Sequence, residues 1–105
     1  AKAGLNNACR IAASEMGHLG IRVNMVSPTV VDTPMVADIL ATPGVRASLE
    51  YETTLGALPV AEDVSNALLW LASDESRFVS GQNIHVDAGG NLRRLPRPDE
   101  FERFA

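Results

Sequence analysis

Two stretches of the chain repeat apolar side chains at helical spacing. Over residues 2–19 the apolar positions recur every three or four residues, which predicts an amphipathic helix. Gly20 follows as a candidate left-handed cap. Residues 61–72 carry the second pattern, with Glu62 and Asp63 placed where they favour a helix N-terminus. The predicted buried stripes are Leu5, Ala8, Cys9, Ala12, Met16 and Leu19 in the first helix, and Val64, Ala67, Leu68 and Leu71, extended by Leu69 and Trp70, in the second.

Two short β-rich runs accompany these helices. Residues 21–27 follow the first helix at once and end at Ser27-Pro28, and residues 83–86 come shortly after the second helix. Apolar runs of this length between turn residues are typical of buried parallel strands. A helix followed closely by such a strand is half of an alternating α/β pattern. The hydrophobic pattern therefore predicts an α/β fold.

The connection over residues 28–59 is irregular, with prolines at 28, 34, 43 and 59. Short helices are predicted at about 34–41 and 44–55. Thr33 is a candidate cap for the first of them, and Pro34 suits its first helical position. A connection this long with little secondary structure is often a lid or a binding loop.

Composition narrows the possible functions. The 105 residues allow one domain at most, and the net charge of −4 gives no basic footprint for nucleic acid. Cys9 is the single cysteine, so it has no partner for an internal disulfide and no zinc cluster is expected; a small core residue is the simplest interpretation. No apolar run approaches the roughly 20 residues that span a bilayer. We expect a reduced, cytoplasmic protein without a metal site.

Charged residues dominate the last fifteen positions. Basic and acidic side chains interleave there, which predicts a solvated, proline-broken tail over residues 91–105. They are Arg93, Arg94, Arg97, Asp99, Glu100, Glu102 and Arg103.

Four segments, in this order, resemble the C-terminal part of a classical short-chain dehydrogenase/reductase. They are Ala1-Lys2-Ala3-Gly4-Leu5-Asn6, Ile21 to Pro28, Val31-Asp32-Thr33-Pro34-Met35, and Gly81 to Gly90. The resemblance implies that residues 1–90 form the C-terminal portion of a Rossmann-like doubly wound parallel sheet that binds NAD(P). It also implies a substrate lid at about 33–58.

The resemblance gives chemical roles to a few residues. Lys2 matches the lysine of the family's Tyr-x-x-x-Lys pair, so the tyrosine would lie four residues earlier, before Ala1. In the family this lysine binds the nicotinamide ribose, and its charge favours the tyrosinate. Taken alone, Lys2 would be an ordinary surface lysine. Pro28 begins the family's Pro-Gly-x-(Val/Ile)-x-Thr-Pro pattern, in which Val31 meets the nicotinamide carboxamide through its backbone and the Thr33 hydroxyl contacts the carboxamide or pyrophosphate.

The implied reaction is the interconversion of a secondary alcohol and a ketone by hydride transfer, with NAD or NADP as cofactor and NAD favoured. Thr29 stands where the family commonly has glycine, and with the Asp-Thr-Pro-Met run it resembles carveol-dehydrogenase-like members, which act on alicyclic alcohols. Met35, Val36, Ile39 and Leu40 are candidate lining residues of an apolar substrate pocket, or they pack the lid. Family members are commonly tetramers.

An alternative interpretation is a catalytically inactive α/β fragment or interaction module. We expect these 105 residues alone to fold poorly and to bind no dinucleotide, because two strands leave an open sheet edge.

Overall fold

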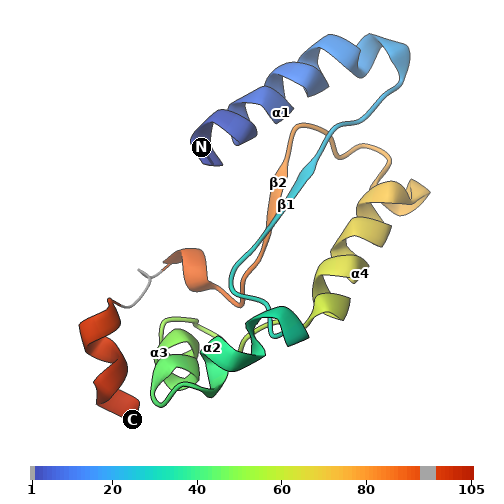
Figure 1. Ribbon diagram of the computed structural model, residues 1–105. Coiled ribbons are helices and arrows are strands. Elements are labelled where there is room, and N and C mark those ends of the chain that lie inside the picture. The colour runs from blue at the N-terminus through green and yellow to red at the C-terminus, as the bar shows by residue number, and fades with distance from the viewer. Residues whose placement is uncertain (1, 93–96) are drawn as a thin grey trace. The chain divides into compact units, whose positions relative to one another are not determined.

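The computed structural model describes residues 2–92 and 97–105, with the side chain of Lys2 outside the description. The chain divides into two compact units. The first comprises Ala1–Ser27 and Ser65–Ile84, and the second comprises Pro28–Val64 and His85–Ala105. Figure 1 labels the helices and strands. Among the described residues no helix is long and apolar enough to cross a membrane.

The first unit begins with the predicted amphipathic helix. Helix α1 covers Lys2–Met16 and continues into a 3₁₀ turn at Gly17–Leu19. Gly20 ends it in the left-handed conformation, with φ of 75°, and its amide donates to the carbonyl of Gly17 at 3.0 Å. The predicted helix and its glycine cap are therefore confirmed.

A small parallel sheet pairs strand β1 (Met25–Pro28) with strand β2 (Asn83–Val86). The prediction for 83–86 is confirmed, but the prediction that a strand begins at Ile21 was wrong. Before Met25 the chain is held by bonds outside the ladder: the Asn24 side chain donates to the carbonyl of Val79 at 2.9 Å and accepts from the amide of Gln82 at 3.0 Å. Regular pairing starts only where the amide of Met25 donates to the carbonyl of Gln82.

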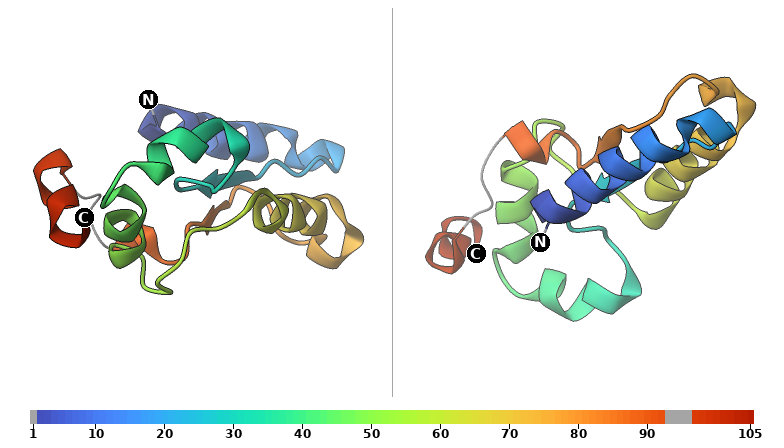
Figure 2. Two further views of the ribbon diagram at one scale, coloured as in Figure 1. Left: turned by 60° about the horizontal axis from the view of Figure 1, so that its bottom comes forward. Right: turned by 90° about the horizontal axis from the view of Figure 1, so that it is seen from above.

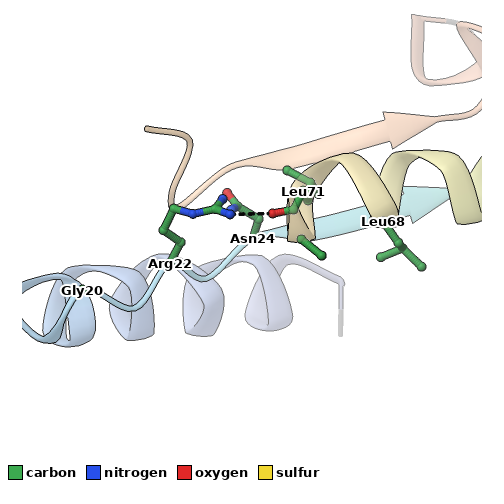
Figure 3. Close-up of a pocket in the computed structure, with 6 residues that line it drawn as sticks. Gly20, Arg22, Asn24, Leu68 and Leu71 are labelled. Atoms are coloured by element: carbon green, nitrogen blue, oxygen red, sulfur yellow. Dashed lines mark hydrogen bonds between the residues drawn. The ribbon is translucent and has the colours of Figure 1, made fainter. Parts of the chain in front are cut away.

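Helix α4 covers Ala61–Ala72, as predicted, and Arg22 closes its C-terminal end (Figure 3). The guanidinium donates to the carbonyls of Leu71 at 2.7 Å, Val79 at 3.0 Å and Ser73 at 3.3 Å, and to the hydroxyl of Ser76 at 3.2 Å. The last carbonyls of a helix have no partner within it, and a cation is favoured beside them. Arg22 therefore joins the segment before β1 to the end of α4.

The second unit contains the predicted lid. A 3₁₀ turn at Pro34–Val36 leads into α2 (Ala37–Ala41), and α3 follows at Val45–Tyr51. The prediction that this second lid helix extends to residue 55 was wrong. Thr53 is buried, and its hydroxyl donates to the carbonyl of Glu50 at 2.7 Å and accepts from the amide of Gly56 at 2.9 Å, which makes a turn in place of further helix.

The two ends of the connection meet at an isolated parallel bridge between Asp32 and Val60. The amide of Asp32 donates to the carbonyl of Pro59 at 2.9 Å. Residues 33–58 therefore form a loop whose ends are tied to each other, as a discrete lid requires.

The last described segment forms a 3₁₀ helix at Pro98–Phe104 that packs on α3, which the prediction of a solvated tail did not include. Most of its residues are nevertheless exposed, as that prediction expected. The sequence did not predict this contact with α3 because Phe101 and Phe104 are the two aromatic residues in a helix that is otherwise mostly charged. Arg93 and Arg94 lie outside the described residues.

The predicted stripes are buried only in part. Cys9 and Leu71 are buried, as expected for core residues, whereas Leu5, Leu19, Leu68 and Trp70 are exposed. A two-stranded sheet has too little surface to cover both amphipathic helices, so most of each stripe remains accessible within the described residues.

We expect Arg22→Met, made in the full-length protein, to lower the free energy of unfolding by roughly 1.5–3 kcal/mol, the range for hydrogen bonds to a charged group. The carbonyls of Leu71, Ser73 and Val79 each lose one donor, and methionine supplies none in its place. Urea unfolding monitored by circular dichroism measures the change. Arg10→Met is the matched control because Arg10 is exposed on α1. Equal unfolding midpoints for the two variants would contradict the role given to Arg22.

Candidate functional site

The candidate cofactor-binding loop leaves the C-terminal end of β1. Pro28 is the last residue of that strand and is exposed. In parallel α/β sheets, ligands bind beyond the carboxyl ends of the strands. Thr29, where the family commonly has glycine, keeps a negative φ, since Ala88 is the one residue other than glycine with positive φ among those described. The turn at this point therefore needs no glycine.

The Thr33 hydroxyl is available for a ligand. Thr33 has an extended backbone, with φ of −132° and ψ of 162°, and its carbonyl accepts from the amide of Val36 at 3.1 Å. Its side chain makes no capping hydrogen bond, so the prediction that this side chain caps the helix was wrong, although Pro34 does stand at the first position. The half-buried hydroxyl has no partner in the described part of the chain.

The backbone groups of Val31 are unpaired among the described residues, and the neighbouring Asp32 is held in place. Within residues 2–92 and 97–105, the amide and carbonyl of Val31 pair with no other backbone group. The next residue, Asp32, is held twice: by the bridge to Val60 and by an ion pair to Arg46, with 2.8 Å between Oδ2 and the guanidinium. The hydrogen bond from Asp32, and then its charge, raise the pKa of Arg46. Because this pKa rises from an already high value, the pair persists at every physiological pH.

Lys2 is the first residue of α1, and its side chain lies outside the described residues. It belongs to the first unit, whereas Pro28, Val31 and Thr33 belong to the second. The structure therefore brings Pro28, Val31 and Thr33 together on one loop, and the ribose contact of Lys2 stays a prediction.

The four candidate lid residues divide into two kinds. Leu40 is 5% exposed and packs inside the lid, whereas Met35 is 91% exposed and Ile39 is also exposed. Val36 is half-buried. Met35 and Ile39 stay candidates for substrate contact, whereas the burial of Leu40 agrees with the interpretation that it packs within this segment.

A cavity of about 480 Å³ lies in the second unit. Its walls are mainly apolar and include Leu55, Leu58 and Val86, with His85 and Asp87 as polar groups. This volume is within the range of small-molecule sites. The sequence carried one local signal, an aspartate two residues before Gly89, which is typical of a side-chain-closed turn.

Asp87 organises the turn beside this cavity. It is 7% exposed, and its carboxylate accepts from the amides of Gly89 at 3.0 Å and Asn91 at 2.9 Å. The carbonyl of Ala88 accepts from the amide of Leu55 and the hydroxyl of Thr54, both at 3.1 Å. The end of the lid is thereby fixed to the segment after β2.

A second cavity, of about 430 Å³, lies beside Arg22 in the first unit (Figure 3). Leu68 and Leu71 form its apolar side. The guanidinium is directed at the carbonyl of Leu71 and is committed to the end of α4. We therefore assign no ligand to this cavity, because its guanidinium already bonds within the protein.

Comparisons with known proteins show the family of the chain. Residues 1–91 match a family described as "Enoyl-(Acyl carrier protein) reductase". The chain is 49% identical over 91 residues to the mitochondrial borneol dehydrogenase of Lavandula x intermedia, covering 87% of this chain and 33% of that protein. It is 39% identical over 102 residues to the mitochondrial (-)-isopiperitenol/(-)-carveol dehydrogenase of Mentha piperita, covering 90% of this chain and 36% of that protein.

Solved structures show the same fold. A short-chain type dehydrogenase/reductase from Mycobacterium ulcerans superposes with a TM-score of 0.86 at 31% identity, covering 99% of this chain and 42% of that one. A 4-hydroxyisoleucine dehydrogenase complexed with NADH superposes with a TM-score of 0.83 at 26% identity, covering 89% of this chain and 38% of that one.

The chain spans about a third of the length of the curated relatives it matches. Its match to the family nevertheless runs from residue 1 to residue 91, across both helices α1 and α4, the two strands and the candidate loop. The chain belongs to the short-chain dehydrogenase/reductase family.

Proposed function

We propose that the protein containing this chain is an NAD(P)-dependent oxidoreductase that interconverts a secondary alcohol and a ketone. The observation that carries the proposal is the loop after β1, where the Thr33 hydroxyl and the Val31 backbone have no partner among the described residues. A polar group without a partner in the protein is favoured where a ligand or water can bond to it. A nicotinamide carboxamide has both a donor and an acceptor to offer these groups.

The residues of this chain bind and orient, and the hydride chemistry is supplied by the bound nicotinamide. Val31 and Thr33 would fix the carboxamide through hydrogen bonds, and Pro28 would direct the loop away from the strand. Lys2 would bind the ribose hydroxyls, and its charge would lower the pKa of a tyrosine placed one helical turn earlier. A phenol with a lowered pKa can exchange a proton with a substrate alcohol near neutral pH.

The substrate class we propose is an alicyclic secondary alcohol. The relatives named above are dehydrogenases of borneol and of isopiperitenol and carveol, and another relative, 44% identical, is the cis-4-hydroxycyclohexanecarboxylate dehydrogenase of Sinomonas cyclohexanicum. The exposed apolar side chains of Met35 and Ile39 on the lid suit a compact hydrocarbon ring. NAD is the favoured cofactor, in line with the NADH-complexed structural relative.

We expect the full-length protein to reduce NAD or NADP when given alicyclic secondary alcohols such as borneol, carveol or cyclohexanol. Linear primary alcohols should react more slowly, because an apolar lid contributes more binding to a ring. The appearance of reduced nicotinamide measures the rate, and each alcohol is tested with both cofactors. Absence of turnover with every alcohol, under conditions in which the protein is folded, would instead favour an inactive interaction module.

We expect Thr33→Val to weaken cofactor binding by roughly three- to tenfold, the value of one net hydrogen bond. The melting temperature should not change, because the hydroxyl stabilises nothing inside the described chain. Isothermal calorimetry with the dinucleotide and thermal melting of the full-length protein give the two readouts.

The matched control for Thr33→Val is Thr53→Val in the same lid. The Thr53 hydroxyl is buried and doubly hydrogen-bonded, so its loss should lower stability by about 1–3 kcal/mol. Its effect on dinucleotide affinity should be small. The opposite pattern, with Thr33→Val destabilising the fold and leaving affinity unchanged, would show that the Thr33 hydroxyl is structural.

A further inference from the structure

Residues 97–105 lie along helix α3 of the lid, and we call this segment the strap. Its 3₁₀ helix, Pro98–Phe104, packs beside α3 in both the original and the turned views (Figures 1 and 2). Both elements belong to the second unit. The contact runs from one end of α3 to the other.

The first contact is between two backbones at the start of α3. Gly44 precedes the helix in a left-handed conformation, with φ of 81°. A Cβ atom placed on Gly44 would overlap the carbonyl oxygen of Phe101. The close approach of the strap therefore requires glycine here, both for the conformation and for the space.

The second contact covers the middle of α3. Ser48 is 1% exposed, and its hydroxyl is 3.4 Å from the carbonyl oxygen of Glu100, to which it donates. At that distance the bond is weak, so burial of this face contributes more than the bond itself. Few residues described here are buried so completely, and the strap forms part of the cover.

The third contact is aromatic and lies at the end of α3. The rings of Tyr51 and Phe104 have centroids 5.4 Å apart and are tilted by 44°. The guanidinium of Arg103 stands 4.9 Å from the centre of the Tyr51 ring and 2.7 Å from a carboxylate oxygen of Glu100. Tilted ring pairs and cations over rings are both attractive arrangements.

Helix α3 depends on such contacts because it has only seven residues. A helix this short is unstable by itself in water and exists through tertiary packing. Helix α2 and the strap are the elements that pack on it. Loss of the strap would therefore shift the lid toward conformations in which α3 is displaced or unwound.

We propose that the strap positions the lid and thereby sets the affinity for substrate, without touching the reacting atoms. The proposal rests on the function proposed above, because it takes residues 33–58 as the substrate lid. Cofactor binding depends on the loop at Val31 and Thr33, which α3 meets only through the exposed ion pair between Arg46 and Asp32. An exposed pair contributes little, so cofactor affinity should respond much less than substrate affinity.

The first test uses Gly44→Ala in the full-length protein. The added methyl group displaces Phe101, so amides of α3 should exchange hydrogen faster, and KM for the alcohol should rise by roughly three- to tenfold. KM for the dinucleotide should stay within twofold of wild type, as an order-of-magnitude bound. Gly20→Ala is the matched control, since Gly20 is also left-handed, with φ of 75°, but has open space where the Cβ would lie. It should reproduce the backbone strain without affecting α3.

The second test uses Phe104→Ala, which leaves the backbone of the lid unchanged. Phe78→Ala is its matched control: Phe78 is exposed and also has an arginine, Arg77, 4.9 Å over its ring, but it lies outside the lid and the strap. Phe104→Ala should raise KM for the alcohol and speed exchange in α3, and Phe78→Ala should do neither.

The outcomes separate this proposal from the proposed function. If the wild-type protein oxidises alcohols but Gly44→Ala and Phe104→Ala leave both exchange in α3 and KM unchanged, the strap proposal is wrong and the function stands. If both KM values rise together, the strap is a general structural element and the proposal is also wrong. If the wild type turns over no alcohol, the proposed function is wrong, and the effect of the strap on substrate affinity is wrong with it. The rate of amide hydrogen exchange in α3 then still shows whether the strap holds the lid.

Discussion

The hydrogen bonds of the Arg22 guanidinium are the constraint on which the first unit depends. Strands β1 and β2 have four residues each, and a ladder of that size fixes little by itself. Arg22 joins the segment before β1 to carbonyls at the end of α4 and in the turns that follow it. One side chain thus adds donors to several carbonyls, beside those supplied by Asn24 and Ser76, and holds the segment before β1 against the end of α4. The loop at Pro28 starts where that strand ends.

The hydroxyl groups described here differ in their hydrogen-bond partners, and this difference separates those that stabilise turns from one that could bind a ligand. Thr53, Thr54 and Ser76 bond to backbone carbonyls and hold turns together. Thr33 has the same chemistry but no partner among the described residues, and it stands on the loop that leaves a parallel strand. A polar group that folding leaves unpaired can strengthen ligand binding without a competing internal bond. This contrast with the other hydroxyls supports the binding role proposed for Thr33.

Local patterns in the sequence were enough to predict α1, α4 and β2, because their periodicity and the Gly20 cap involve neighbouring residues. The start of β1 was not predictable, since Asn24 and Arg22 bond to residues more than forty positions away. The end of α3 was not predicted either, because the helical pattern continues to Leu55 while the hydrogen bonds of Thr53 make a turn there instead. The family motif grouped Val31 and Thr33 as a cofactor-binding unit, which stays a prediction, and only coordinates could show that their polar groups are unpaired among the described residues.

The division between a fixed loop and a held lid has a physical basis. The cofactor loop is tied by the Asp32–Val60 bridge and the Asp32–Arg46 ion pair, so its groups are ready for a ligand before it arrives. The lid must admit a substrate, and a helix of seven residues held by a few aromatic and backbone contacts can be displaced at modest cost. A ligand shifts such an equilibrium only by its differential affinity for the two states. A strap that adds about one order of magnitude to the closed population therefore changes substrate affinity by the same factor. The cofactor loop, which α3 meets through the exposed Asp32–Arg46 pair, should change much less.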